Sequence, residues 1–120
     1  MSKATFVLIP GAGGDGGYWY LVARLLQARG HDAVPVFLPA ADDAAGWKEY
    51  ADAAVDAVGD RGGVVVVAQS LGGFSAPLVC DRIQVGLLVL LNAMMSCEAP
   101  LLWFTCQCMA SMLVKVAPEP

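Results

Sequence analysis

A run of four valines, Val64 to Val67, constrains the fold of this chain more than any other feature. β-Branched side chains are restricted at χ1 and favour strands, and a run that is apolar on both faces is typical of a strand buried in a parallel sheet. Residues compatible with a helix begin directly after Ser70. Because the chain turns from strand to helix within so few residues, we expect a strained backbone conformation at Ser70.

Small residues flank this serine at the two positions where such a turn needs them. Ala68 lies two residues before Ser70, and Gly72 lies two residues after it. The pattern matches the nucleophile elbow G-x-S-x-G, with alanine in place of the first glycine. A serine among glycines is also common in ordinary turns, but the preceding valine strand and the following helix favour the elbow. We therefore predict that Ser70 is a catalytic nucleophile supported by Ala68 and Gly72.

Segments typical of strands and of helices alternate along the chain. Apolar runs bounded by proline or glycine predict strands over residues 5–9, 33–38 and 85–91, besides the valine run. Apolar residues at helical spacing predict helices over residues 18–29, 47–58 and 70–82. In the first of these helices, an apolar stripe is expected to pack on the sheet: Leu21, Val22, Leu25, Leu26 and Ala28. The alternation indicates right-handed βαβ crossovers, hence an α/β three-layer fold with a parallel sheet.

Composition and charge exclude several classes of partner. The chain has 120 residues, enough for one domain, and only 15 % of them are charged, below the roughly 25 % typical of soluble domains. A net charge of −4 leaves no basic patch for nucleic acid or anionic lipid. The apolar run before Pro10 is too short for a secretory signal or a membrane span, so we expect a cytoplasmic protein. The four cysteines form no C-x-x-C pair, which indicates reduced thiols and no metal site: Cys80, Cys97, Cys106 and Cys108.

Four segments of this sequence resemble the α/β-hydrolase superfamily in their order and spacing: residues 6–12 (FVLIPGA), 25–31 (LLQARGH), 68–73 (AQSLGG) and 87–93 (LLVLLNA). In detail the chain is similar to the small esterases related to plant methylesterases and hydroxynitrile lyases. The resemblance extends from about Thr5 to Met95. It implies a sheet in the spatial order second, first, third and fourth strand. It also implies hydrolysis of a small-molecule carboxylic ester, or another acyl substrate, through a Ser70 acyl-enzyme, with no metal or organic cofactor.

The resemblance also assigns the remaining parts of the site. The backbone N–H groups of Ala12 and Leu71 match the two donors of the family's oxyanion hole. A helix that begins at the serine aims N–H groups and the positive end of its dipole at the same point, which supports this assignment independently. Pro10 and Gln69 stand where many relatives have histidine. Neither position transfers protons in the family, so we expect a change in pocket polarity there and no loss of chemistry.

The general base is the part of the site that the sequence lacks. Such enzymes carry their triad in the chain order nucleophile, acid, histidine. The single histidine, His31, precedes Ser70 and is expected to be structural. The carboxylates after the serine are Asp81, expected on a helix surface, Glu98, where some relatives hold their acid, and Glu119. Without a base the serine hydroxyl is a poor nucleophile, so we expect impaired hydrolysis.

The sequence divides into a partial hydrolase core over residues 1–95 and an atypical tail over residues 96–120. The alternation of strand and helix segments is lost in the tail, and residues 101–110 show neither the helical nor the strand period. One interpretation is that the reading frame is shifted or ends early. The other is a short amphipathic helix that covers the edge of the fourth strand, and if that edge were exposed it would allow self-association.

Two further classes of function stay open at this stage. Gly11-x-Gly13-x-x-Gly16 after the first strand matches the dinucleotide-binding fingerprint, with Asp42 or Asp43 placed to meet a ribose. Pro10 at the strand exit and the many glycines in the first helical turns argue against this assignment. The remaining class is a non-catalytic hydrolase-fold fragment that binds a ligand or a partner.

Overall fold

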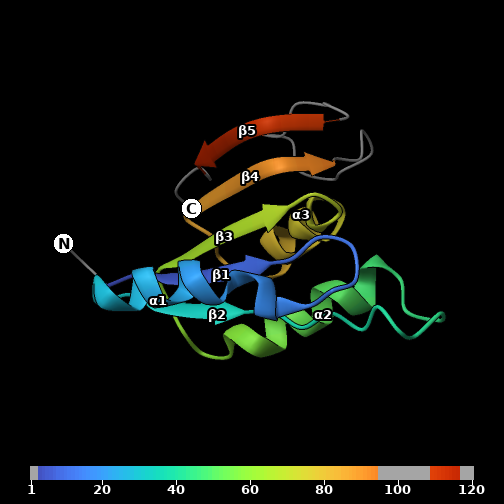
Figure 1. Cartoon of the computed structure of the whole chain (residues 1–120), viewed down its shortest axis with the longest axis horizontal. Coiled ribbons are helices and arrows are strands. Elements are labelled where there is room, and N and C mark those ends of the chain that lie inside the picture. Colours follow the sequence, from blue (N-terminus) through green and yellow to red (C-terminus); the bar gives the residue numbers. More distant parts are fainter. Residues whose placement is uncertain (1–2, 95–108, 117–120) are drawn as a thin grey trace.

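The structure is a computed structural model that describes residues 3–94 and 109–116. Its elements, in chain order, are β1 (Thr5–Ile9), η1 (Gly16–Trp19), α1 (Tyr20–Ala28), β2 (Asp32–Pro35), α2 (Trp47–Val58), β3 (Val64–Gln69), α3 (Gly72–Arg82), β4 (Leu87–Met94) and β5 (Met109–Val116). One sheet has the strand order β2-β1-β3-β4-β5 (Figure 1). The pairs among β1, β2, β3 and β4 are all parallel. Both the α/β fold and the predicted order of the first four strands are confirmed.

The strand residues alternate between the two faces of the sheet, which produces three layers. On one face, Val7, Ile9 and Val66 join the main core with residues of α2 and α3. On the other face, Leu8 packs against Trp19 of η1 and Ala23 of α1. The valine strand is therefore buried on the face toward α2 and α3, whereas Val65 and Val67 on the other face are only half buried.

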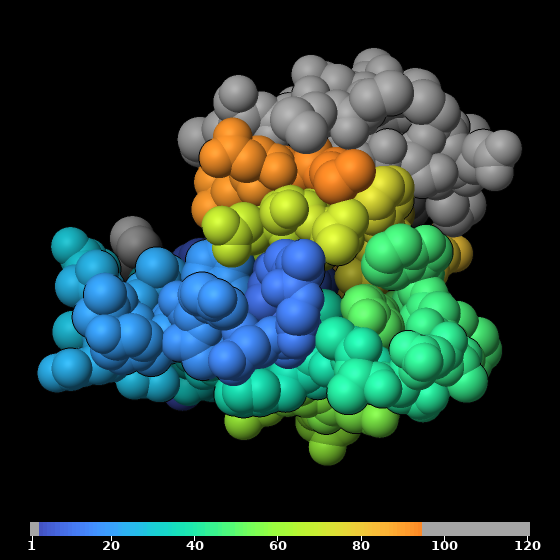
Figure 2. Space-filling model, turned by 45° about the vertical axis from the view of Figure 1, so that its right-hand side comes forward, coloured from blue at the N-terminus to red at the C-terminus, as the bar shows by residue number. Residues whose placement is uncertain are grey.

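Helix α1 packs on the sheet through a different face from the predicted one. Leu21 and Leu25 are 58 % and 59 % exposed, and Val22 and Ala28 are also exposed, so the predicted stripe was wrong at these four positions. Leu26 is the one member of the stripe that packs against the core, together with Ala23 of α1 and Trp19 of η1. Because this helix is apolar on adjacent faces, periodicity alone did not show which face meets the sheet. Figure 2 shows parts of β3 and β4 at the surface beside α1.

Strand β4 is an inner strand in this sheet, which corrects the expectation of an exposed edge. β5 runs antiparallel to it, with Leu87 opposite Val116 and Met94 opposite Met109. Residues 109–116 therefore form a strand, and the predicted edge-covering helix is wrong for this part of the tail. The self-association expected of an open β4 edge loses its basis. The rest of the tail lies outside the described residues, and the frame-shift interpretation stays a hypothesis.

None of the helices in the described part of the chain is long and apolar enough to cross a membrane.

An ion pair links helices α2 and α3 at the surface. Asp52 of α2 pairs with Arg82 of α3 and with Lys48 one helical turn away.

The Asp52 pair should make stability depend on acid pH. The hydrogen bond from Arg82, followed by the one from Lys48, holds the pKa of Asp52 below its ordinary value. The pair therefore stabilises the fold above the unfolded-state pKa of about 4, and this contribution is lost as the pH falls through the lower folded-state pKa. We expect Asp52→Asn to lower the Tm slightly near neutral pH and to match the unsubstituted chain below both pKa values. Thermal unfolding at both pH values tests this, with the exposed Asp56→Asn as control. An equal loss of Tm at both pH values would contradict it.

Candidate active site

Ser70 lies in the turn between β3 and α3 and has a φ of +52°. A positive φ is uncommon outside glycine, so the predicted strain at this serine is confirmed. The turn is tied to β4 on both sides. The Ser70 N–H donates to the Leu91 carbonyl over 3.2 Å, and its carbonyl accepts the Met94 N–H over 2.9 Å. These bonds hold the residue in a conformation that it would not adopt by itself.

Small side chains allow this turn to sit against β1. A Cβ atom at Gly72 would lie 2.9 Å from Ile9 Cγ2 and 3.0 Å from the Pro10 carbonyl oxygen, closer than real Cβ contacts allow. Ala68 is completely buried and is paired with Ile9 and Leu90 in the neighbouring strands. Both positions that the sequence singled out are therefore tightly packed around the serine.

The loop after β1 approaches the serine closely. A Cβ atom at Gly11 would lie 3.0 Å from Ser70 Cβ and 3.6 Å from Ser70 Oγ. Gly11, Ala12 and Ser70 line a cavity of about 200 Å³ together with Tyr18 and Gln69. The structure thus brings the loop and the serine together at the carboxyl ends of β1 and β3. The oxyanion-hole role of the Ala12 and Leu71 N–H groups stays a prediction.

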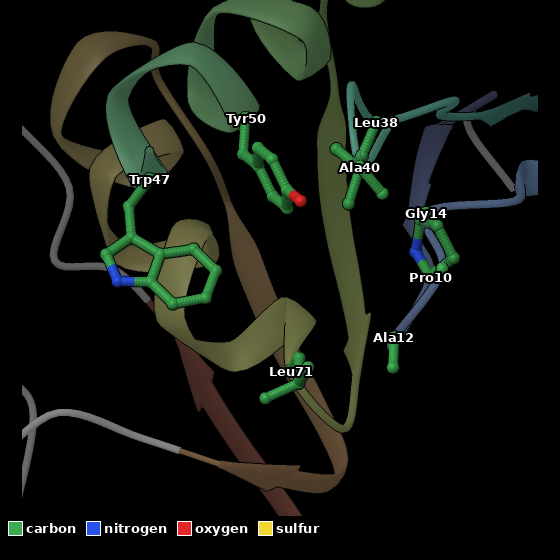
Figure 3. A pocket seen from close by; sticks show the side chains of 10 residues that line it. Pro10, Ala12, Gly14, Leu38, Ala40, Trp47, Tyr50 and Leu71 are labelled. Carbon is green, nitrogen blue, oxygen red and sulfur yellow. The ribbon is translucent and has the colours of Figure 1, made fainter. Parts of the chain in front are cut away.

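A second cavity, of about 230 Å³, adjoins the same loop on the side of α2 (Figure 3). It is lined by Pro10, Gly11, Ala12, Gly13, Gly14, Leu38, Ala40, Trp47, Tyr50 and Leu71. The apolar spacing of residues 47–58 predicted a helix that includes Trp47 and Tyr50, but it did not place these two residues at the site. A signal was available, because helices of βαβ units run antiparallel to the strands. The first turn of α2 therefore lies at the same sheet edge as Ser70.

His31 is far from the serine and has a structural role. Its Nδ1 accepts the Ala4 N–H over 3.0 Å, and its ring packs edge-on against Phe6 at 5.3 Å between centroids. These contacts lie at the amino ends of β1 and β2, whereas Ser70 lies at the carboxyl end of β3. A five-residue strand separates the two edges by about 16 Å. The structural assignment of His31 is confirmed, and it does not serve as a base for Ser70 in this fold.

The carboxylates that follow Ser70 supply no partner among the described residues. Asp81 is exposed on α3, as expected. Glu98 and Glu119 lie outside the described residues.

The glycine-rich loop does not have the geometry of a dinucleotide site. Asp15 caps the short helix η1, accepting the Gly17 N–H through its own carboxylate over 2.8 Å. A pyrophosphate at this helix end would meet a negative charge. A Cβ atom at Gly16 would lie 2.7 Å from the Val36 carbonyl oxygen, so this glycine serves packing. Asp42 accepts the Ala44 N–H in an exposed loop. Gly11, Gly16 and Asp42 of the fingerprint thus have structural explanations.

Cys80 lies partly buried on α3. In the part of the chain that the structure describes, no group of three or more His, Cys, Asp or Glu side chains could hold a metal ion. The other cysteines, Cys97, Cys106 and Cys108, lie outside the described residues. Burial raises the pKa of the Cys80 thiol to about 12.

The Cys80 thiol should therefore react slowly in the folded chain. Because the thiolate is the nucleophile, we expect iodoacetamide to label Cys80 roughly 10³-fold more slowly than in the urea-unfolded chain near pH 8. Peptide mass spectrometry over a time course measures both rates. Similar rates in the two states would show that this thiol is solvated and not packed in α3.

Comparison with known proteins gives consistent matches. The family model described as "Alpha/beta hydrolase family" matches residues 6–117. The chain is 35 % identical over 89 residues to "Probable esterase PIR7A" of Oryza sativa subsp. indica, which covers 64 % of this chain and 33 % of the rice protein. This chain thus spans about a third of that relative.

Solved structures with the same fold include polyneuridine aldehyde esterase, with a TM-score of 0.68 and 24 % identity over 78 % of this chain and 42 % of that chain. An extracellular alpha/beta-hydrolase from a Paenibacillus species matches with a TM-score of 0.70 and 20 % identity, over 78 % of this chain and 42 % of that chain. At these identities the match supports the fold alone.

Proposed function

Because this chain belongs to the alpha/beta hydrolase family, we propose that it is the nucleophile-bearing part of a carboxylic-ester hydrolase. The observation that carries the proposal is the elbow itself. Ser70 has a φ of +52° at the end of β3, and a Cβ at Gly11 would approach its Cβ to 3.0 Å. A strained serine beside a close backbone loop is the arrangement that acyl transfer requires.

The proposed reaction uses Ser70 Oγ to attack the ester carbonyl carbon. The carbonyl oxygen becomes an oxyanion, which accepts hydrogen bonds from the Ala12 and Leu71 N–H groups. Solvent water takes the proton that Ser70 Oγ loses and returns one to the leaving oxygen, so the intermediate expels the alcohol and leaves an acyl group on Ser70. A second water molecule then attacks this acyl group and releases the acid, and Ser70 regains its proton. Two observations support this assignment. Leu71 is the N-cap residue of α3, and Ala12 follows the glycine that approaches the serine.

The proposal includes impaired turnover, since the attack also needs a base for the serine proton. His31 is the single histidine of the sequence, and it lies at the opposite edge of the sheet. In a serine protease, removal of the serine or the histidine costs on the order of 10⁶ in turnover. About 10³ to 10⁴ over the uncatalysed rate then remains from binding and oxyanion stabilisation. We expect Ser70 of this chain to react slowly.

Intact-mass spectrometry after incubation with a fluorophosphonate tests this function. We expect one adduct per chain, formed slowly, and none on Ser70→Ala. Circular dichroism of both proteins establishes that they are equally folded. A folded chain that forms no adduct at high probe concentration would contradict the nucleophile assignment and favour a non-catalytic hydrolase-fold fragment.

A further inference from the structure

The 230 Å³ cavity between α2 and the loop after β1 is lined in part by Ala12 and Leu71, but the steps proposed above give no role to its interior or to its aromatic wall. Its wall is mostly apolar. Among the lining side chains, polar atoms occur only in Trp47 and Tyr50. An apolar cavity of about 150 Å³ is large enough to bind benzene, so this one has room for an aromatic ring with a short substituent.

Aromatic side chains shape one wall of this cavity. Trp47 stacks on Phe74 with 5.0 Å between ring centroids, and it meets Tyr50 edge to face at 5.5 Å. These contacts hold the indole in place although Trp47 is 43 % exposed. In Figure 3, Trp47 and Tyr50 reach from α2 toward the side of the cavity formed by Ala12 and Leu71. Aromatic rings in such a setting gain from offset or edge-to-face contact with a further ring.

The cavity adjoins the nucleophile site. Gly11 and Ala12 line both this cavity and the smaller one that contains Ser70. Leu71, the residue after the serine, lines the larger cavity. A group held in this cavity therefore lies beside Ala12 and Leu71, which flank the serine site.

From this arrangement, and resting on the proposed function, we infer the class of substrate. The ester carries an aromatic ring on a short linker, with the ring in the cavity beside Trp47 and Tyr50 and the carbonyl at Ser70. The ring of the substrate supplies binding energy at a position remote from the bond that breaks. The linker is short because the two cavities are neighbours, both lined by Gly11 and Ala12.

Reversible binding to the Ser70→Ala chain tests this inference without any turnover. Ligand-detected NMR titrations compare benzyl acetate with cyclohexylmethyl acetate, which has a similar shape and no π system. We expect benzyl acetate to bind roughly 2- to 10-fold more tightly. In the same background, Trp47→Leu should remove this preference.

A matched pair of tryptophan substitutions locates the binding. Ala40 and Ala44 are both exposed in the same loop, but only Ala40 lines the cavity. We expect Ala40→Trp to weaken benzyl acetate binding by more than about 10-fold because the new ring fills the space, and Ala44→Trp to leave it unchanged. Equal affinities in this pair, or equal affinities for the two esters, would overturn the inference.

These results are independent of the fluorophosphonate experiment. An adduct on Ser70 without aryl preference would leave the hydrolase assignment standing and remove the aromatic substrate class. Aryl binding that Ala40→Trp abolishes, with no adduct on Ser70, would place an aromatic ligand in the cavity and overturn the hydrolase assignment.

Discussion

Replacement of Gly73 by alanine is expected to leave the chain without a stable, cooperatively folded state. A Cβ atom at this position would overlap the Met94 carbonyl oxygen and would lie 3.0 Å from Ala93 Cβ. Met94 has no freedom to move away, because its N–H is bonded to the Ser70 carbonyl over 2.9 Å. Core overpacking costs about 1–3 kcal/mol where side chains adjust, and we expect a larger loss here because backbone is in the way. Domains of this size are stable by only about 5–15 kcal/mol.

Urea unfolding followed by circular dichroism measures this effect, with Gly86→Ala as the matched control. A Cβ at Gly86 would meet only the Val64 carbonyl oxygen, at an ordinary contact distance of 3.8 Å. We expect the control to unfold at the same urea concentration as the unsubstituted chain or slightly above it. If Gly73→Ala also kept that midpoint, the close approach of α3 to the end of β4 would be wrong.

Gly11→Ala is expected to slow the reaction of Ser70 with a fluorophosphonate by about 100-fold while the fold persists. The new Cβ would lie 3.0 Å from Ser70 Cβ, and the serine is held by hydrogen bonds to β4. The loop must therefore retreat, and it carries the Ala12 N–H away from the developing oxyanion. Loss of one such donor costs about 10²–10³ in rate, and a displacement near 1 Å costs about 10².

The control for this prediction is the same substitution at Gly62, where a Cβ would meet no atom within 4 Å. Time courses of adduct formation by intact mass, together with the Tm of each variant, separate an effect on the site from an effect on the fold. A Gly11→Ala chain that reacted at the unsubstituted rate would show that this loop takes no part in the chemistry. A chain with a collapsed Tm would show that the glycine is needed for folding.

Local spacing in the sequence predicted much of the framework. The bounds of β1 and α2 agree with the prediction, because proline or glycine stops each apolar run at the residue where the element ends. The strain at Ser70 was also predictable, since a valine strand and a helix leave so few residues for the turn. The strand at the end of the chain was not predicted from the sequence. Residues 109–116 form β5 because they pair with the free backbone N–H and C=O groups along the edge of β4.

The sequence by itself determined an α/β framework with a parallel sheet and a serine in a strained turn at the end of its central valine strand. Those features depend on neighbours within a few residues, which residue types and spacing describe. Only the tertiary structure decided which face of α1 is buried, that His31 lies at the sheet edge opposite to Ser70, and that Trp47 meets the loop beside the serine. Each of these depends on contacts between distant segments, and the free energy of such contacts comes from packing that local spacing does not specify.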